Sequence, residues 1–145
     1  MSNGVSYNVS YSIISLLNAY GTGARRIVGF VISMFNNAYY FGVPGDLRSV
    51  YVHGNVGYRR VYGYVMYIRR FRSVSIHIGV SRIRREFGDC AAYWGWQVLA
   101  HEIAHLVGVG GGITLGMAVF TLAWLRNYYW RPCLWKLPYH LPITC

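Results

Sequence analysis

Val98-Leu-Ala-His-Glu-Ile-Ala-His-Leu106 is the stretch of sequence that decides the fold. It contains the pattern His-Glu-x-x-His at 101–105, and apolar residues flank this pattern at helical spacing, which predicts a helix. Two histidines four residues apart lie on the same face of a helix, about one turn from each other. The chain has only 5 histidines and 4 acidic residues among 145 positions, so a chance occurrence of the pattern is rare.

This spacing is typical of a zinc site. The ring nitrogens of His101 and His105 can reach a single Zn²⁺ at about 2.0–2.1 Å. Glu102 lies slightly to the side of the two histidines, so we expect it to contact a water bound to the Zn2+ ion rather than the ion itself. Zinc lowers the pKa of such a water towards about 7, and a carboxylate can then move its proton to the leaving amine. The alternative is a pair of solvated histidines beside an ordinary glutamate, against which the apolar flanks argue.

The sequence around this helix predicts a single α+β domain over residues 1–145. Three runs rich in valine, isoleucine and tyrosine precede the motif helix and predict strands. In the last run Val74, Ile76 and Ile78 alternate with small or polar residues, which predicts a half-buried strand. The predicted elements are N-terminal helices at 11–20 and 24–40, a three-stranded sheet from 48–53, 60–68 and 74–80, the motif helix from Asp89 to about Gly108, a closing helix at about 113–128, and an irregular tail from about 131.

The last predicted strand and the motif helix together resemble a known family. The segment from Val74 to Ile83, followed after a spacer by Val98–Leu106, is similar to the SprT-like group of small gluzincin-type zinc metalloendopeptidases, and more broadly to a minimal zincin domain. The likeness covers about residues 45–108. It implies an edge strand that precedes the active-site helix and pairs with an extended substrate. SprT-like proteins are associated with DNA, and some cut proteins crosslinked to it, so the likeness also implies DNA-associated protein substrates.

The resemblance assigns His101 and His105 to the metal and Glu102 to catalysis, and it implies a third ligand after the motif helix. A catalytic zinc site has three protein ligands and one open position. No acidic residue follows Glu102, and no histidine stands between His105 and His140. His140, in a stiff proline-flanked segment, is the first candidate for the third ligand, and an exposed tail histidine is the alternative. The other candidates are Cys133, Cys145, His53 and His77. A closing segment that supplies no third ligand would leave an inactive site.

A large excess of positive charge is the second feature, with a net charge of +10 from 14 Lys and Arg against 4 Asp and Glu. Such a field attracts nucleic acid or an anionic membrane surface. Tyrosines interleave with the central arginines, and arginines on phosphates with tyrosines stacked on bases bind single strands. The predicted nucleic-acid contacts are Arg59, Arg60, Arg69, Arg70, Arg72, Arg82, Arg84 and Arg85. A solvated sheet face is the alternative, and a basic nucleic-acid-binding protein with a vestigial metal site is the rival function.

The uncharged stretch from Leu106 to Leu125 bears on a membrane role. The chain is 54% hydrophobic with a mean hydropathy of +0.27, and this stretch has the length and flanks of a transmembrane helix. Its glycines at 108 and 110–112 instead favour a loop followed by a buried helix. We therefore expect a protein that is soluble without detergent. With 3 cysteines and no secretory signal we expect it to be cytoplasmic. A membrane-associated metalloprotease is the alternative.

Overall fold

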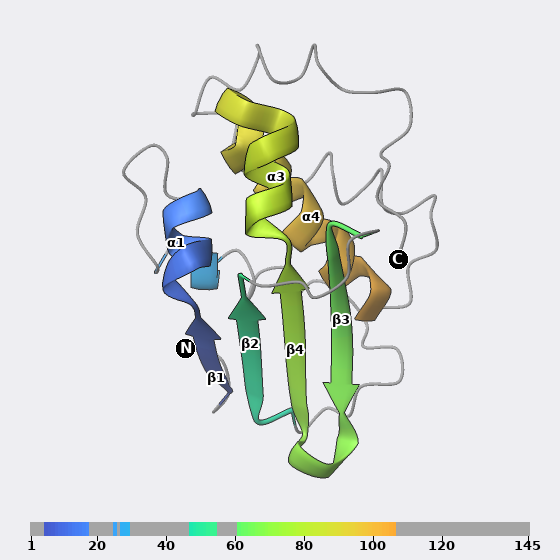
Figure 1. Ribbon diagram of the computed structural model, residues 1–145. Coiled ribbons are helices and arrows are strands. Elements are labelled where there is room, and N and C mark those ends of the chain that lie inside the picture. The colour runs from blue at the N-terminus through green and yellow to red at the C-terminus, as the bar shows by residue number, and fades with distance from the viewer. Residues whose placement is uncertain (1–4, 18–24, 26, 30–46, 55–60, 107–145) are drawn as a thin grey trace.

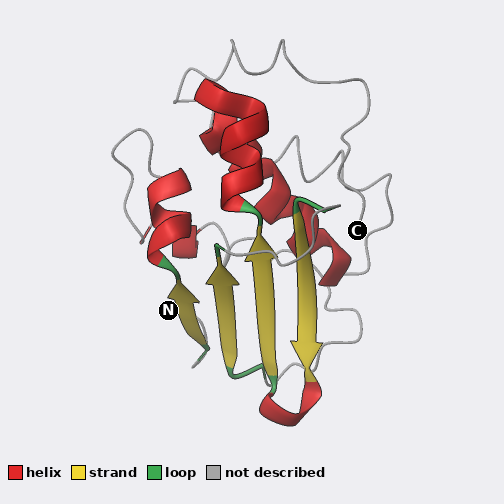
Figure 2. Ribbon diagram, in the orientation of Figure 1, coloured by secondary structure: helices red, strands yellow, loops and turns green. Residues whose placement is uncertain are grey.

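The computed structural model describes residues 5–17, 25, 27–29, 47–54 and 61–106. Within these residues a mixed four-stranded sheet is packed against helices, which confirms the α+β class (Figures 1 and 2). Residues 25 and 27–29 are helical, as predicted. The remainder of that predicted helix, the predicted closing helix and the tail lie outside the described residues.

A strand and a helix begin the described chain, three further strands follow, and two helices end it. The strands are β1 (Ser6–Val9), β2 (Ser49–His53), β3 (Gly63–Ile68) and β4 (Ser73–Ile78). The helices are α1 (Tyr11–Leu17), α3 (Val80–Phe87) and α4 (Ala91–Leu106), with short 3-10 turns η1 (Arg69–Phe71) and η2 (Gly88–Cys90). In the sheet order β1-β2-β4-β3, the first three strands are parallel and β3 is antiparallel to β4.

The prediction of a three-stranded sheet is wrong, because β1 adds a fourth strand. β1 has only four residues, and its alternate residues are exposed, so its sequence carries little strand signal. Pairing with the neighbouring strand fixes the position of β1, since Tyr7 pairs with Val50 of β2. Main-chain bonds from Ser6 to Arg48 and from Ser10 to Val52, both 2.9 Å, extend this pairing at the two ends. The main-chain hydrogen bonds to β2 therefore stabilise this short strand.

β4 is an interior strand, which corrects the prediction of a half-buried strand and of an edge strand in this segment. β2 pairs with it on one side and β3 on the other. Every residue of β4 except His77 is buried. Ser75 is covered because its small side chain lies between Tyr51 of β2 and Met66 of β3, its partners in the register. Among the described strands, the edge strand on this side of the sheet is therefore β3, which pairs with β4.

The strand predicted to continue to Val80 ends earlier, and Val80 is the first residue of α3. Val80 and Ile83 of this helix are buried and Phe87 is partly buried, a spacing of three and four residues that lines one helix face. Three arginines, a glutamate and a serine occupy the other positions, so charged residues dominate the segment and its helical pattern is hard to recognise in the sequence. This mixture explains why the sequence does not predict α3.

α4 confirms the predicted motif helix and lies against β3 and β4, while α1 and α3 pack against it (Figure 1). Its side chains Trp94, Leu99 and Ile103 are buried in the core. Gly95 allows α1 to approach closely, because a Cβ there would lie 2.6 Å from Leu17 Cδ2. None of the helices within the described residues has both the length and the apolar character needed to cross a bilayer.

Candidate metal centre

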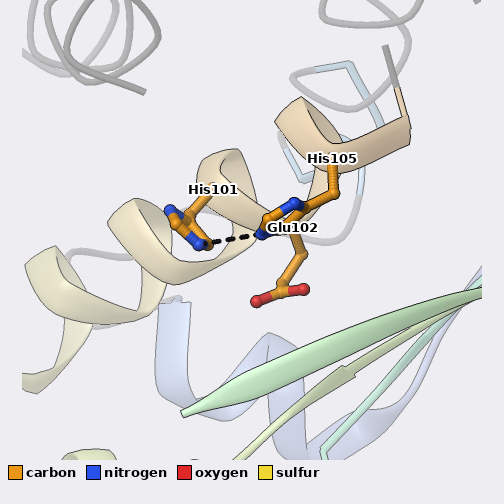
Figure 3. Close-up of side chains that lie close together, drawn as sticks. All are labelled: His101, Glu102 and His105. Atoms are coloured by element: carbon orange, nitrogen blue, oxygen red, sulfur yellow. Dashed lines mark hydrogen bonds between the residues drawn. The ribbon is translucent and has the colours of Figure 1, made fainter. Parts of the chain in front are cut away.

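The two histidines of the motif point at the same place. On α4 the Nε2 atoms of His101 and His105 lie 3.1 Å apart, and the rings are nearly perpendicular, with an interplanar angle of 82° (Figure 3). Two nitrogens that bind one tetrahedral zinc ion at about 2.0–2.1 Å are separated by about 3.3–3.4 Å. The pair therefore fits two positions of such a site.

Glu102 supplies a buried carboxylate beside this pair. Its side chain is 0% exposed, and its carboxylate and the two histidine rings offer ligand atoms that all lie within 4.8 Å of one another. Figure 3 shows the carboxylate on the side of α4 that faces the sheet. Of the three acidic residues in the described part of the chain, Glu86 and Asp89 are exposed and only Glu102 is buried. Burying a carboxylate is costly unless hydrogen-bond donors or a cation compensate for it.

Gly63, the first residue of β3, makes room for this carboxylate. A Cβ at Gly63 would lie 3.2 Å from Glu102 Cγ, 3.1 Å from Val98 Cγ1 and 2.7 Å from the carbonyl oxygen of His77. A glycine inside a strand often marks a place where another segment approaches closely. Gly63 is not among the residues predicted for the site, and the signal that identifies it is a glycine inside the predicted strand 60–68.

The environment of His101 keeps its ring neutral. Burial, and to a smaller extent the charge of His105, lowers the pKa of His101 to about 4. At neutral pH the imidazole therefore holds one proton on one nitrogen and presents a lone pair on the other. A neutral ring is the form of histidine that binds metal.

Hydrogen bonds to Glu86 from Tyr62 and Arg82 hold α3 against the residue that precedes β3. The Tyr62 hydroxyl donates to the Glu86 carboxylate, Arg82 Nε donates to Glu86 Oε1 at 3.1 Å, and the Arg82 guanidinium lies 4.1 Å from the centre of the Tyr62 ring. Burial opposes ionisation of Glu86, but the bonds from Tyr62 and Arg82 and the nearby arginine charges outweigh it and lower its pKa. Burial and then Glu86 raise the pKa of Tyr62. This group joins α3 to the residue that precedes Gly63.

The candidates for a third ligand fall into two sets. His140, Cys133 and Cys145 lie outside the described residues. His53 and His77 pair across β2 and β4, and their rings stack on each other with centroids 4.9 Å apart. Because side chains alternate along a strand, His77 lies on the face opposite the core residue Ile76, away from α4. The structure thus does not bring these two histidines to the pair on α4.

The other face of the sheet carries a row of stacked rings. The Tyr64 and His77 rings lie 4.3 Å apart at 10°, and the stack continues through His53 to Tyr51. Within this row the ring faces are turned towards one another. The sequence predicts tyrosines next to arginines but not this stacking, because the row joins residues of three strands.

The described arginines of the predicted nucleic-acid contact form two groups rather than one patch. Arg69, Arg70 and Arg72 lie at the turn before β4, and Arg82, Arg84 and Arg85 lie on α3 after it. The length of β4, six residues or about 20 Å, separates the two groups. Arg48, which the prediction omits, joins the first group through a main-chain bond of 2.8 Å to Arg72. Arg59 and Arg60 lie outside the described residues, and contact with nucleic acid stays a prediction.

No protein-family model, no curated protein and no solved structure matches the chain.

Proposed function

We propose that this chain is a zinc-dependent metallopeptidase of the His-Glu-x-x-His type. One observation carries the proposal: the Nε2 atoms of His101 and His105 converge to 3.1 Å beside the buried carboxylate of Glu102. Two histidines four residues apart and an adjacent glutamate form the set of side chains that zinc peptidases use.

His101 and His105 would hold the metal, and α4 fixes their spacing. Zinc bound there would polarise the carbonyl of the scissile peptide bond and make a water acidic enough to lose a proton near neutral pH. The lowered pKa of His101 supports this role, because protons compete for its nitrogen only in acid. His140 remains the first candidate for the third ligand.

Glu102 would move the proton. Its carboxylate lies within a few ångströms of both histidine rings and inside the protein, where a charge interacts strongly with its neighbours. It would accept a proton from the attacking water and return it to the nitrogen of the leaving amine, which completes hydrolysis. The close contact at Gly63 holds Glu102 in place for both transfers.

β3 would position the substrate. It pairs with β4 along one side, and among the described strands none pairs with its other side. The main-chain groups of such an edge can bind an extended peptide as an added strand. Because β3 begins at Gly63, beside Glu102, a peptide on this edge would pass the catalytic carboxylate. DNA-associated proteins are the substrate class that the SprT-like resemblance adds to the proposal.

Zinc analysis of purified variants tests the proposal. We expect one zinc per chain in the wild type and loss of stoichiometric zinc in His101→Ala and in His105→Ala. His53→Ala is the matched control, because His53 lies in the ring row and should leave the zinc content unchanged. Wild-type protein without zinc, or full zinc in His101→Ala, would contradict the proposal and favour a binding protein with a vestigial motif.

A further inference from the structure

We propose that the turn between β3 and β4 binds an acidic segment of the substrate, about six residues to the amino-terminal side of the scissile bond. This inference rests on the proposed peptidase function and names a determinant of its specificity. The basic turn consists of Arg69, Arg70, Phe71 and Arg72 together with Arg48.

The basic turn is a rigid and exposed cluster. All four arginines are exposed, and so is Phe71 at 61%. Main-chain bonds hold the cluster together, from Arg72 to Arg69 at 3.2 Å and from Arg48 to Arg72 at 2.8 Å. The guanidinium of Arg70 lies 5.5 Å from the centre of the Phe71 ring. None of the three described acidic residues belongs to the turn, and the exposed side chains of Arg69 and Arg70 carry the positive charge that an acidic partner would meet.

β3 connects this cluster to the candidate metal centre. The strand starts at Gly63, in contact with Glu102, and ends at Ile68, directly before Arg69 (Figure 1). Six steps along a strand at about 3.4 Å each give a distance of about 20 Å. An extended peptide on the same edge rises by the same amount per residue. Its residue about six positions from the scissile bond therefore reaches the basic turn.

The direction of the peptide follows from the pairing rule. Antiparallel pairing is somewhat more stable per residue than parallel pairing. A peptide antiparallel to β3 runs from the basic turn towards Gly63, because β3 runs the opposite way. The residues that precede the scissile bond then lie at the turn.

An acidic peptide fits this surface better than nucleic acid does. Both would complement the arginines, but bases also need aromatic faces on which to stack. The exposed ring of the turn, Phe71, already has the Arg70 guanidinium over it. The rings on the neighbouring sheet face are stacked on one another, with Tyr64 against His77 and His77 against His53. The strand edge beside the turn offers main-chain groups, which peptides can pair with along their whole length.

The probe is a pair of fluorescein-labelled peptides that differ only in charge. One has two glutamates about six residues before a central bond, and the other has two glutamines there. Binding is measured by fluorescence anisotropy on Glu102→Gln protein, so that cleavage does not interfere. We expect the glutamate peptide to bind about 2- to 30-fold more tightly at low salt, the range for two exposed ion pairs. The difference should shrink as salt screens the charges.

A matched pair of variants locates the effect. Arg69→Gln with Arg70→Gln should abolish the preference for glutamate. Arg84→Gln with Arg85→Gln removes the same charge from α3 and should retain it. Wild-type protein should cut the glutamate peptide about six residues after the acidic pair, as mapped by mass spectrometry.

Equal binding of the two peptides, or an equal loss of preference in both double variants, would overturn the inference. So would a preference for glutamates placed after the scissile bond. A twelve-residue oligothymidylate serves as the rival probe. If its binding is lost in the Arg69/Arg70 variant while the peptides show no difference, the turn binds nucleic acid instead. Absence of zinc and of cleavage with an intact glutamate preference would remove the proposed function and leave the acidic-peptide site standing.

Discussion

Gly63 is the residue whose replacement tests the geometry of the candidate site most directly. In Gly63→Ala the new Cβ would lie 2.7 Å from the His77 carbonyl oxygen, closer than such atoms approach in proteins, and 3.2 Å from Glu102 Cγ. The pairing of β4 fixes that oxygen, so β3 and α4 must shift instead. Overpacking of this kind costs about 1–3 kcal/mol. For a chain of this size the thermal midpoint should fall by about 2–12 °C.

Two other glycines provide controls for urea or thermal unfolding. Gly29→Ala adds a methyl group where nothing lies within 4 Å, in a helical segment, and should be neutral or stabilising by up to about 1 kcal/mol. Gly95→Ala meets side-chain atoms of Leu16 and Leu17, whereas Gly63→Ala meets a main-chain oxygen, so Gly95→Ala should cost less than Gly63→Ala. If Gly63→Ala unfolds within about 0.5 kcal/mol of the wild type, the close contact between β3 and α4 is not as described.

The same variant separates zinc binding from activity. The spacing of His101 and His105 belongs to α4 alone, so Gly63→Ala should keep its zinc. Glu102 owes its position to β3, so peptide hydrolysis should fall by more than the zinc content does.

Three further predictions concern the proton-transfer residue, an ion pair and the membrane alternative. In Glu102→Gln, zinc should stay bound while hydrolysis falls by a factor on the order of 10² or more, and zinc loss would show that Glu102 is a ligand. The pKa of Glu86 lies below its ordinary 4.5, so its charged form stabilises the fold above that pH and this stabilisation is lost as pH falls through the lowered pKa. Wild type should therefore exceed Glu86→Gln in unfolding free energy at pH 7, and this difference should shrink as the pH falls below 4.5. A difference that stays constant in acid would refute this. Finally, the full chain should be recovered without detergent, and recovery only from the membrane fraction would support a transmembrane Leu106–Leu125.

The parts of the structure that could be predicted are those determined by the pattern of residues within one continuous segment. α4 follows from apolar side chains at helical spacing and from the two histidines within it. β2 and β3 follow from runs of residues that favour strands. In each case the signal lies within the element itself, so no knowledge of distant segments is needed.

The parts that could not be predicted depend on contacts between distant segments. β1 exists through its pairing with β2, and β4 is interior because β3 turns back against it. The contact of Gly63 with Glu102 and the union of Arg48 with Arg72 have the same origin. A register between strands is set by packing over the whole sheet, and a single segment does not contain it.

Because the histidine pair depends on local contacts and Glu102 on a distant segment, the two parts of the motif should form at different times during folding. The pair His101 and His105 is complete as soon as one turn of α4 forms, and helix formation takes about a microsecond or less. Glu102 reaches its buried place only when β3 docks, a contact between distant residues that forms more slowly. A folding chain would therefore form its two metal-binding histidines before the Glu102 carboxylate reaches its buried position. Under the proposed function, the peptidase would stay inactive until its sheet is assembled, and this order would protect the unfolded chain from self-cleavage.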